Sequence, residues 1–352
     1  MELNAANERL KHRYVAYLRG ARQLGEHSID QVLAALNRFE DYSRRKGFKD
    51  FRIEQAIGFK KHLSNLDTKA GTAKLSKATI TSTLYALKDF VAWLAEQKGF
   101  RNRLSRTDAD YFKPSRRDEA IARRARPMLV PTVEQIRTLV AAMQTSSVID
   151  RRNRALVAIT IVTGARDNAT ASLRLKHLDL ADRQLYQDAR DVRTKFGKSF
   201  PTWFFPVGDD FVSTLADWRR ELVETLGYGP DDPLFPQTEV AFGPDGEVLP
   251  ARLKRECWAN ADPIRKVFKQ ACSAAGLPDF KPHSFRHTLV QLADDFCSTP
   301  GEFKVWSQNL GHKEVLVTLT SYGTVPGHKQ REMILRMAQN GATKASNNVT
   351  AA

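Results

Sequence analysis

The sequence is poor in cysteine, and no proline occurs before Pro114. The three cysteines, Cys257, Cys272 and Cys297, show no C-x-x-C spacing and are odd in number, which argues against a disulfide framework. We expect three reduced, buried thiols in a cytosolic protein. Residues 1–105 thus lack the residue type that most strongly breaks a helix.

Long apolar runs are also missing. The most apolar stretch, ALVAITIVTGA at 155–165, is too short to span a bilayer and is typical of a buried helix. The N-terminal MELNAANERLKHRY has no apolar core of the kind found in a secretory signal. We therefore expect no membrane segment and a cytoplasmic location.

Positive charge, by contrast, is in excess. The chain has 55 Lys and Arg against 40 Asp and Glu, a formal net charge of +15, which predicts a polyanionic partner. Nucleic acid and an anionic membrane surface both fit this excess. The membrane surface is the weaker alternative, because no basic amphipathic helix with bulky apolar anchors is evident. A hydrophobic content of 42% over 352 residues suits two domains with cores of their own.

Residues 1–105 have the pattern of a small helical bundle. The segment HSIDQVLAALNRFEDYSRRKG (27–47) repeats apolar residues at helical spacing, with Ser28 as the expected N-cap and Gly47 as the stop. The segment SKATITSTLYALKDFVAWLAEQKG (76–99) shows the same spacing. These periodicities predict about four amphipathic helices with basic outer faces.

A basic run separates this bundle from the rest of the chain. Residues 101–131 contain nine Lys or Arg but only four Asp or Glu. Their prolines disfavour a continuous helix, so we expect an extended basic linker over 106–131. Such a run is either merely solvated or follows a nucleic-acid backbone, and the sequence leaves both roles open. The candidate nucleic-acid contacts are Arg116, Arg117, Arg123, Arg124 and Arg126.

Residues 132–330 are predicted to form a second domain of helices and a few strands. Thr132 and Gln135 form a capping box before an apolar run. Strand-like runs within 178–207 predict a sheet of two or three strands, and 331–352 is expected to be a partly disordered C-terminal helix or tail. The expected fold class is therefore mainly α with a small antiparallel β-sheet. Helical patterns cover 132–144, 150–163, 167–176, 209–227, 261–275, 283–297 and 300–309.

The helix within KPHSFRHTLVQLADDF (281–296) has a charged side. Its apolar stripe comprises Phe285, Leu289, Leu292 and Phe296. His283, Arg286 and His287 fall opposite this stripe, either as a solvated face or as an anion-binding group. The two histidines have the spacing of a zinc helix, but the glutamate of an H-E-x-x-H motif is missing, so we expect no metal.

Two turns add further cations. In VTGARDNATASLRL, Arg166 follows Gly164 at the start of a helix, where a guanidinium would complement a phosphate. In TKFGKSF, Lys195 and Lys198 flank a glycine between two expected strands. Taken singly, these side chains are equally well explained as surface or edge residues.

The segment LGHKEVLVTLTSYG (310–323) adds an imidazole and a phenol. Gly311 is a helix-ending signal, and His312 follows it directly. Tyr322 is the only tyrosine after Tyr228. Packing roles are open for both side chains when the segment is taken alone.

The order of these pieces resembles the tyrosine recombinase family, which includes the phage integrases and the Cre-like site-specific recombinases. That order is T-G-x-R, a hairpin lysine, H-x-x-R on a helix, L-G-H and a final tyrosine, and the resemblance covers the whole chain. It implies a helical core-binding domain at 1–105 and an α+β catalytic domain at 132–330. Carried over by position, the implied catalytic residues are Arg166, Lys195, His283, Arg286, His312 and the nucleophile Tyr322.

The resemblance implies a DNA strand transferase that forms a 3′-phosphotyrosyl link without a metal, a nucleotide or another cofactor. Guanidiniums suit the non-bridging phosphate oxygens, histidines can donate to these oxygens or take the nucleophile's proton, and lysine can protonate the departing 5′ oxygen. The implied partners are duplex DNA with an inverted-repeat core site and a homotetramer on synapsed DNA, in a nucleoid-associated location. Accessory DNA-bending proteins are left open.

Two departures from the family pattern keep other functions open. Three residues after the first arginine, where the family usually has an acid, stands Ala169, and Asp167 and Asp179 are the candidates to replace that acid. From His312 to Tyr322 is 322 − 312 = 10 positions, one more than is usual in the family. The alternatives are a type IB topoisomerase, which needs no paired sites, and a non-catalytic DNA-binding relative.

Overall fold

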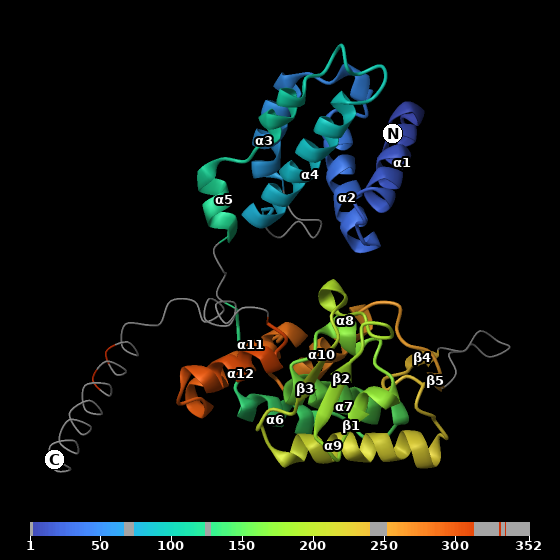
Figure 1. Ribbon diagram of the computed structural model, residues 1–352, viewed down its shortest axis with the longest axis vertical. Coiled ribbons are helices and arrows are strands. Elements are labelled where there is room, and N and C mark those ends of the chain that lie inside the picture. Colours follow the sequence, from blue (N-terminus) through green and yellow to red (C-terminus); the bar gives the residue numbers. More distant parts are fainter. Residues whose placement is uncertain are drawn as a thin grey trace. The chain divides into compact units, whose positions relative to one another are not determined.

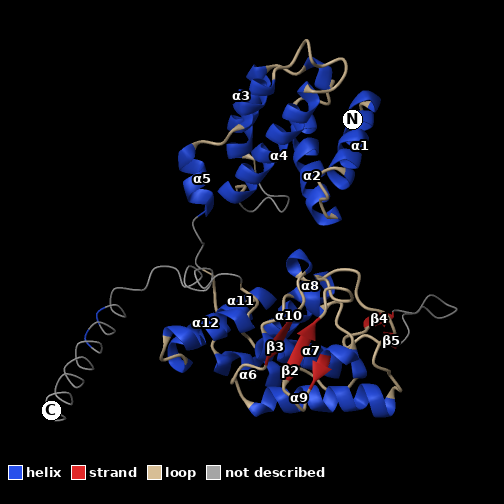
Figure 2. Ribbon diagram, in the orientation of Figure 1, coloured by secondary structure: helices blue, strands red, loops and turns tan. Residues whose placement is uncertain are grey.

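The computed structural model describes residues 3–66, 74–123, 128–239 and 252–312, together with Arg331 and Leu335. The chain forms two compact units, Met1–Arg126 and Pro127–Ala352, which divide within the expected linker. In the described ranges, the first unit is helical and all the strands belong to the second unit (Figures 1 and 2). The predicted class, mainly α with small antiparallel sheets, is confirmed.

The first unit is built on amphipathic helices. Its α-helices are α1 (Ala5–Gly20), α2 (Glu26–Tyr42), α3 (Ile53–Asn65), α4 (Lys77–Ala95) and α5 (Arg116–Arg123), with 3-10 turns at Phe48–Asp50 (η1) and Arg106–Phe112 (η2). Buried aromatic rings fill the core, and Phe39 packs edge-on against Phe59 and Phe112. The prediction of Ser28 as the cap of α2 is wrong, because the chain enters the helix three residues earlier. Gly25 is the N-cap, and its carbonyl accepts from Ser28 N at 2.9 Å.

The expectation of an extended chain after the bundle is wrong for η2 and α5. Both elements contact α4, because acidic residues of the run find partners on that helix. Lys88 pairs with Asp110 and Lys77 with Asp118, each at 2.8 Å. The Tyr85 hydroxyl donates to Glu119. The candidate DNA contacts Arg116, Arg117 and Arg123 are exposed, whereas Arg124 and Arg126 lie outside the described residues.

The second unit has one buried central helix, α7 (Val148–Thr163), whose residues 155–162 are all buried. It contacts α9 (Asp209–Arg220), which runs along one side of the unit in Figure 1. The other α-helices are α6 (Val133–Ala142), α8 (Asp167–Thr170), α10 (Asp262–Ala274), α11 (Pro282–Phe296) and α12 (Pro300–Asn309). The predicted capping box before α6 is confirmed, with Thr132 N donating to Gln135 Oε1 at 2.9 Å and Gln135 N to Thr132 Oγ1 at 3.2 Å.

Short strands complete the second unit. The predicted sheet has the antiparallel order β1-β2-β3, with Leu185 opposite Thr202. The strands are β1 (Leu178–Asp179), β2 (Gln184–Gln187), β3 (Phe200–Trp203), β4 (Gln237–Glu239) and β5 (Arg252–Lys254), and the short turns are η3 (Leu175–His177), η4 (Lys195–Gly197) and the π-helical η5 (Glu221–Thr225). The sequence did not predict the β4–β5 pair.

The helix predicted for 167–176 is much shorter in the structure, because α8 covers only Asp167–Thr170. Leu173 and Leu175 instead exchange backbone hydrogen bonds with a distant segment. Leu234 N donates to Leu173 O at 2.9 Å, and Leu175 N donates to Asp232 O at 3.0 Å. Pairing with this segment replaces the helical hydrogen bonds that α8 would need to continue.

The three cysteines are free thiols, of which Cys272 is buried while Cys257 and Cys297 are half-buried. Within the described ranges, no helix has the length and apolar character that crossing a membrane requires. The same ranges contain no group of three or more His, Cys, Asp or Glu residues arranged to hold a metal ion.

Candidate active site

Arg286 of α11 is buried, with only 5% of its surface exposed. The prediction that Arg286 lies on the helix face opposite the core is therefore wrong. The guanidinium replaces solvent with backbone partners: Nη1 donates to Gly164 O at 2.8 Å, and Nη2 donates to Leu310 O. Arg286 thus joins the end of α7 to the end of α12. Phe296, predicted for the core stripe, is 49% exposed and stacks on Trp306.

Gly164 makes this approach of α7, α11 and α12 possible. Its φ of +60° is a left-handed conformation that favours glycine. A Cβ at this position would lie 2.9 Å from Leu289 Cδ1 and 3.0 Å from Leu310 Cδ2. A larger residue would therefore push the Gly164 carbonyl away from Arg286.

Arg166 follows this turn and is the N-cap residue of α8. Its guanidinium is half-buried, and burial lowers its pKa. Unlike Arg286, it has no side-chain partner among the residues that the structure describes. A partly desolvated guanidinium without a partner is a favourable position for an anion.

Both arginines line one cavity of about 400 Å³. Four of the six predicted catalytic residues meet there: Arg166, Lys195, His283 and Arg286. The remaining lining residues are Ala165, Asp167, Arg265, Lys281 and Pro282. The described lining therefore has five Lys or Arg side chains and one carboxylate, that of Asp167. This excess of positive charge suits a phosphate.

Burial lowers the pKa of Arg286 to about 9, and the nearby charge of Arg166 acts in the same direction. Arg286 therefore stays charged at neutral pH. An anion between the two guanidiniums would relieve their repulsion, which is a second reason to place a phosphate in this cavity.

The two predicted histidines are held in their neutral forms. His283 is exposed to solvent, but partial desolvation, followed by the charges of His287, Arg286 and Arg166, lowers its pKa to about 4. The half-buried His312 has its pKa lowered to about 4, first by burial and then by Arg286 and Arg166. At neutral pH each imidazole can therefore accept a proton or donate one hydrogen bond.

Lys195 comes from the turn η4 between β2 and β3, as the sequence predicts. Its exposed side chain lines the cavity, whereas Lys198 is not among the lining residues. This placement favours Lys195 over Lys198 as the lysine that reaches a bound phosphate.

The turn that carries His312 is held by a glycine and by β3. Gly311 has a φ of +71°, and a Cβ on it would lie 2.7 Å from the ring of Phe200. Gly311 N donates to Gln308 O at 2.7 Å, and His312 N donates to Ser307 O at 3.2 Å. These bonds close the end of α12, as predicted for Gly311. The predicted nucleophile Tyr322 lies outside the described residues.

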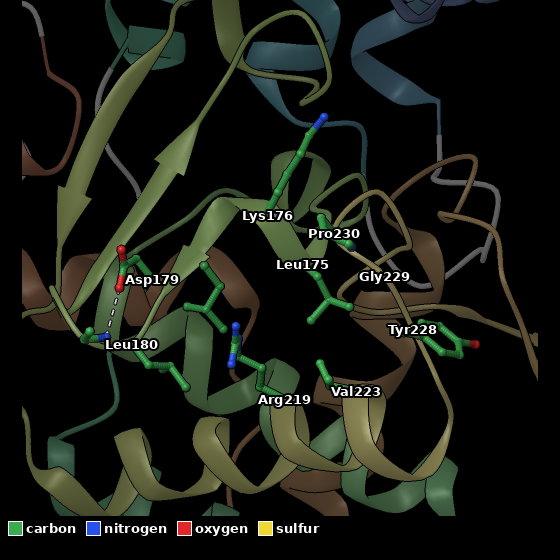
Figure 3. Close-up of a pocket in the computed structure, with 11 residues that line it drawn as sticks. Leu175, Lys176, Asp179, Leu180, Arg219, Val223, Tyr228, Gly229 and Pro230 are labelled. Carbon is green, nitrogen blue, oxygen red and sulfur yellow. Dashed lines mark hydrogen bonds between the residues drawn. The ribbon is translucent and has the colours of Figure 1, made fainter.

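A second cavity, of about 470 Å³, lies between the η3–β1 segment and the end of α9 (Figure 3). Lys176, Arg219 and Tyr228 are among its lining residues, and none of the predicted catalytic residues is. Asp179 lines this cavity and accepts backbone hydrogen bonds from Ala181 at 2.9 Å and from Asp182 at 3.0 Å. Of the two candidate carboxylates, only Asp167 lies in the cavity that contains Arg166.

Comparisons with known proteins identify the family. The family model described as the phage integrase family matches residues 130–325. Tyrosine recombinase XerC of Stutzerimonas stutzeri (strain A1501) is 24% identical over 305 residues, which cover 87% of this chain and 88% of that protein.

Two solved structures show the same fold. The Tn1549 transposon integrase in complex with transposon right end DNA superposes with a TM-score of 0.59 at 14% identity, covering 94% of this chain and 99% of that chain. A lambda integrase tetramer bound to a Holliday junction superposes with a TM-score of 0.58 at 16% identity, covering 91% of this chain and 79% of that chain. Because the family model matches more than half of the sequence, the chain belongs to the phage integrase family of tyrosine recombinases.

Proposed function

We propose that the 400 Å³ cavity binds the scissile phosphate of a DNA strand and that Tyr322 attacks this phosphate. As a member of its family, the protein is a site-specific recombinase that breaks and rejoins DNA. The observation that carries the site assignment is the pair of arginines. Arg286 is fixed by two backbone carbonyls, while the guanidinium of Arg166 faces the same cavity without a partner in the described chain.

Each residue of the site has its own role in the reaction. The Tyr322 hydroxyl oxygen bonds to phosphorus while the bond from phosphorus to the 5′ oxygen breaks, which leaves a 3′-phosphotyrosyl link. Arg166 and Arg286 hold the non-bridging oxygens as negative charge grows on them. His283 and His312, neutral at pH 7, are suited to take the phenol proton or to donate to these oxygens.

Lys195 donates a proton to the departing 5′ oxygen, so that a neutral 5′ hydroxyl leaves. Rejoining reverses these steps with the 5′ hydroxyl of another strand. Because the phosphotyrosyl link conserves the energy of the broken bond, rejoining requires no nucleotide.

The partner is duplex DNA with an inverted-repeat core site, bound by four copies of the chain on synapsed DNA. The similarity to a lambda integrase tetramer on a Holliday junction supports this assembly. The first unit adds DNA-backbone contacts through exposed arginines of α5, namely Arg116, Arg117 and Arg123. The protein acts on DNA in the cytoplasm, associated with the nucleoid.

The test is a nicked suicide duplex that carries an inverted repeat identified in the DNA flanking the gene. Cleavage next to the nick releases a short fragment and traps the covalent complex. The wild-type chain should form this adduct, and Tyr322→Phe should bind the duplex equally well without forming it. Recombination between two paired sites, but no relaxation of a plasmid that lacks the site, distinguishes a recombinase from a type IB topoisomerase. Absence of a wild-type adduct would refute the proposal.

A further inference from the structure

Asp167 and Arg265 form an ion pair at the cavity that contains Arg166. Arg265, on α10, places Nε and Nη2 each 2.9 Å from Asp167 Oδ2. Its remaining nitrogen, Nη1, donates to Asp262 Oδ1 at 2.9 Å. All three nitrogens of the guanidinium are therefore engaged by carboxylates.

The ion pair connects α8 to α10 directly beside Arg166, whose guanidinium must point towards the bound phosphate. Asp167 directly follows Arg166 and begins α8, which is only four residues long. Two hydrogen bonds start this helix, from Thr170 N to Arg166 O at 2.9 Å and from Ala171 N to Asp167 O at 3.0 Å. Because the Arg166 guanidinium has no partner in the described chain, its direction depends on the backbone of this short helix.

A carboxylate this close to a phosphate site would otherwise oppose anion binding. Among the described residues, Asp167 is the only acid that lines the cavity, and its side chain is 25% exposed. Pairing with Arg265 neutralises this charge while it anchors α8. Ala169, two residues further on, is buried in the apolar core and offers no charged contact.

We propose that Asp167 and Arg265 are a positioning pair for DNA cleavage, which holds Arg166 towards the scissile phosphate. This inference rests on the proposed function. Arg265 acts through Asp167 and the backbone of α8 and does not bind the phosphate, because a phosphate would have to displace one of its two carboxylates. The alternative role, direct contact of Arg265 with DNA, predicts different effects of the same substitutions.

The experiment measures the rate of single-turnover adduct formation on the nicked duplex and, separately, the Kd for that duplex. Arg265→Ala and Asp167→Asn should each slow adduct formation about 10- to 100-fold, since a small misplacement of a catalytic group costs this much. The double variant, which removes both charges, should keep the Kd within about twofold of wild type, because no phosphate contact is lost. Arg265→Ala alone should raise the Kd, because it leaves the Asp167 carboxylate without its partner beside the phosphate. The double variant should be no slower than the slower single variant, because both changes break one interaction.

Two further variants separate positioning from general damage to the fold. The charge swap of Asp167→Arg with Arg265→Asp should recover part of the lost rate. Arg220→Ala is the matched control, because Arg220 has an exposed i, i+3 pair with Asp217 on α9 and should cleave at the wild-type rate. Recovery by the swap also excludes misfolding as the cause of the slow single variants.

The outcomes that overturn the inference are distinct from those that overturn the function. If the wild type forms no adduct, the proposed function fails and this inference with it. If the wild type cleaves and Arg265→Ala cleaves equally fast, only the positioning role fails. Direct DNA contact replaces it if Arg265→Ala raises the Kd and lowers its salt dependence while Asp167→Asn cleaves at the wild-type rate or faster.

Discussion

Asn309, the last residue of α12, pairs with the backbone of Trp203 on β3 in both directions. Trp203 N donates to Asn309 Oδ1 at 2.8 Å, and Asn309 Nδ2 donates to Trp203 O at 2.8 Å. The adjacent Thr202 hydroxyl donates to Asn309 O at 3.2 Å. The end of α12 is thereby fixed to the sheet, and the turn that provides both Leu310 O and His312 is fixed with it.

The first prediction concerns Asn309→Ala. This change removes both side-chain hydrogen bonds, and we expect it to lower the free energy of unfolding by about 1–3 kcal/mol. It should also slow adduct formation, because His312 and the carbonyl that holds Arg286 lose their support. Urea denaturation and the suicide-duplex assay measure the two effects. Gln308→Ala, at the exposed neighbouring position, is the control, and equal behaviour of the two variants would contradict this role of Asn309.

Alanine substitutions of Arg286 and Arg166 should differ in their effect on stability, although both should abolish cleavage. Arg286→Ala leaves the buried carbonyls of Gly164 and Leu310 without a donor, so we expect a loss of about 1–3 kcal/mol in stability. Arg166→Ala removes a partly buried cation without a partner in the described chain, so its stability should be unchanged or higher. Both variants should fail to form the adduct. A large loss of stability in Arg166→Ala would show that its guanidinium has a structural partner.

Low pH should destabilise the protein through its histidines. The pKa of His312 is about 4 in the folded protein, below its ordinary value of 6.5. His283, His287 and His177 are lowered in the same direction, chiefly by burial. Between these values the unfolded chain binds more protons than the folded one, so the free energy of unfolding falls as pH falls from 6.5 towards 4.

Urea titrations at pH 7, 5.5 and 4.5 measure this slope. We expect His312→Gln to flatten it, because one group that protonates on unfolding is removed. His27→Gln, on the exposed surface of α2, is the control. An unchanged slope in His312→Gln would show that the folded protein does not hold this imidazole neutral.

The sequence predicted the parts of this site that depend on local chemistry. The capping box of Thr132, the turn at Gly164 and the helix end at Gly311 are each specified by a few neighbouring residues, and the structure has all three. The T-G-x-R motif, the hairpin lysine and the H-x-x-R motif indicated which side chains to bring together, and the four side chains that they supply line one cavity. Such signals need no knowledge of distant contacts.

What the sequence missed depends on such distant contacts. Helical periodicity placed Arg286 away from the core, but it cannot reveal that two backbone carbonyls, from α7 and from the end of α12, approach that face. The truncation of α8 and the β4–β5 pair likewise depend on segments that meet only in the folded chain. Asn309 had one usable signal, an asparagine at the end of a helix directly before L-G-H, where its amide can pair with a strand.

The last prediction distinguishes the two lysines of the β2–β3 connection. Lys195 lines the cavity and Lys198 does not, so Lys195→Ala should slow cleavage strongly while Lys198→Ala, the matched control, should be mild. The physical reason is the leaving group: an alkoxide leaves slowly unless a nearby ammonium supplies a proton. A 5′-phosphorothiolate substrate tests this directly, because its thiolate leaves without protonation. This substrate should restore cleavage by the Lys195→Ala variant. If it restores cleavage by Lys198→Ala and not by Lys195→Ala, Lys198 is the lysine that protonates the departing 5′ oxygen.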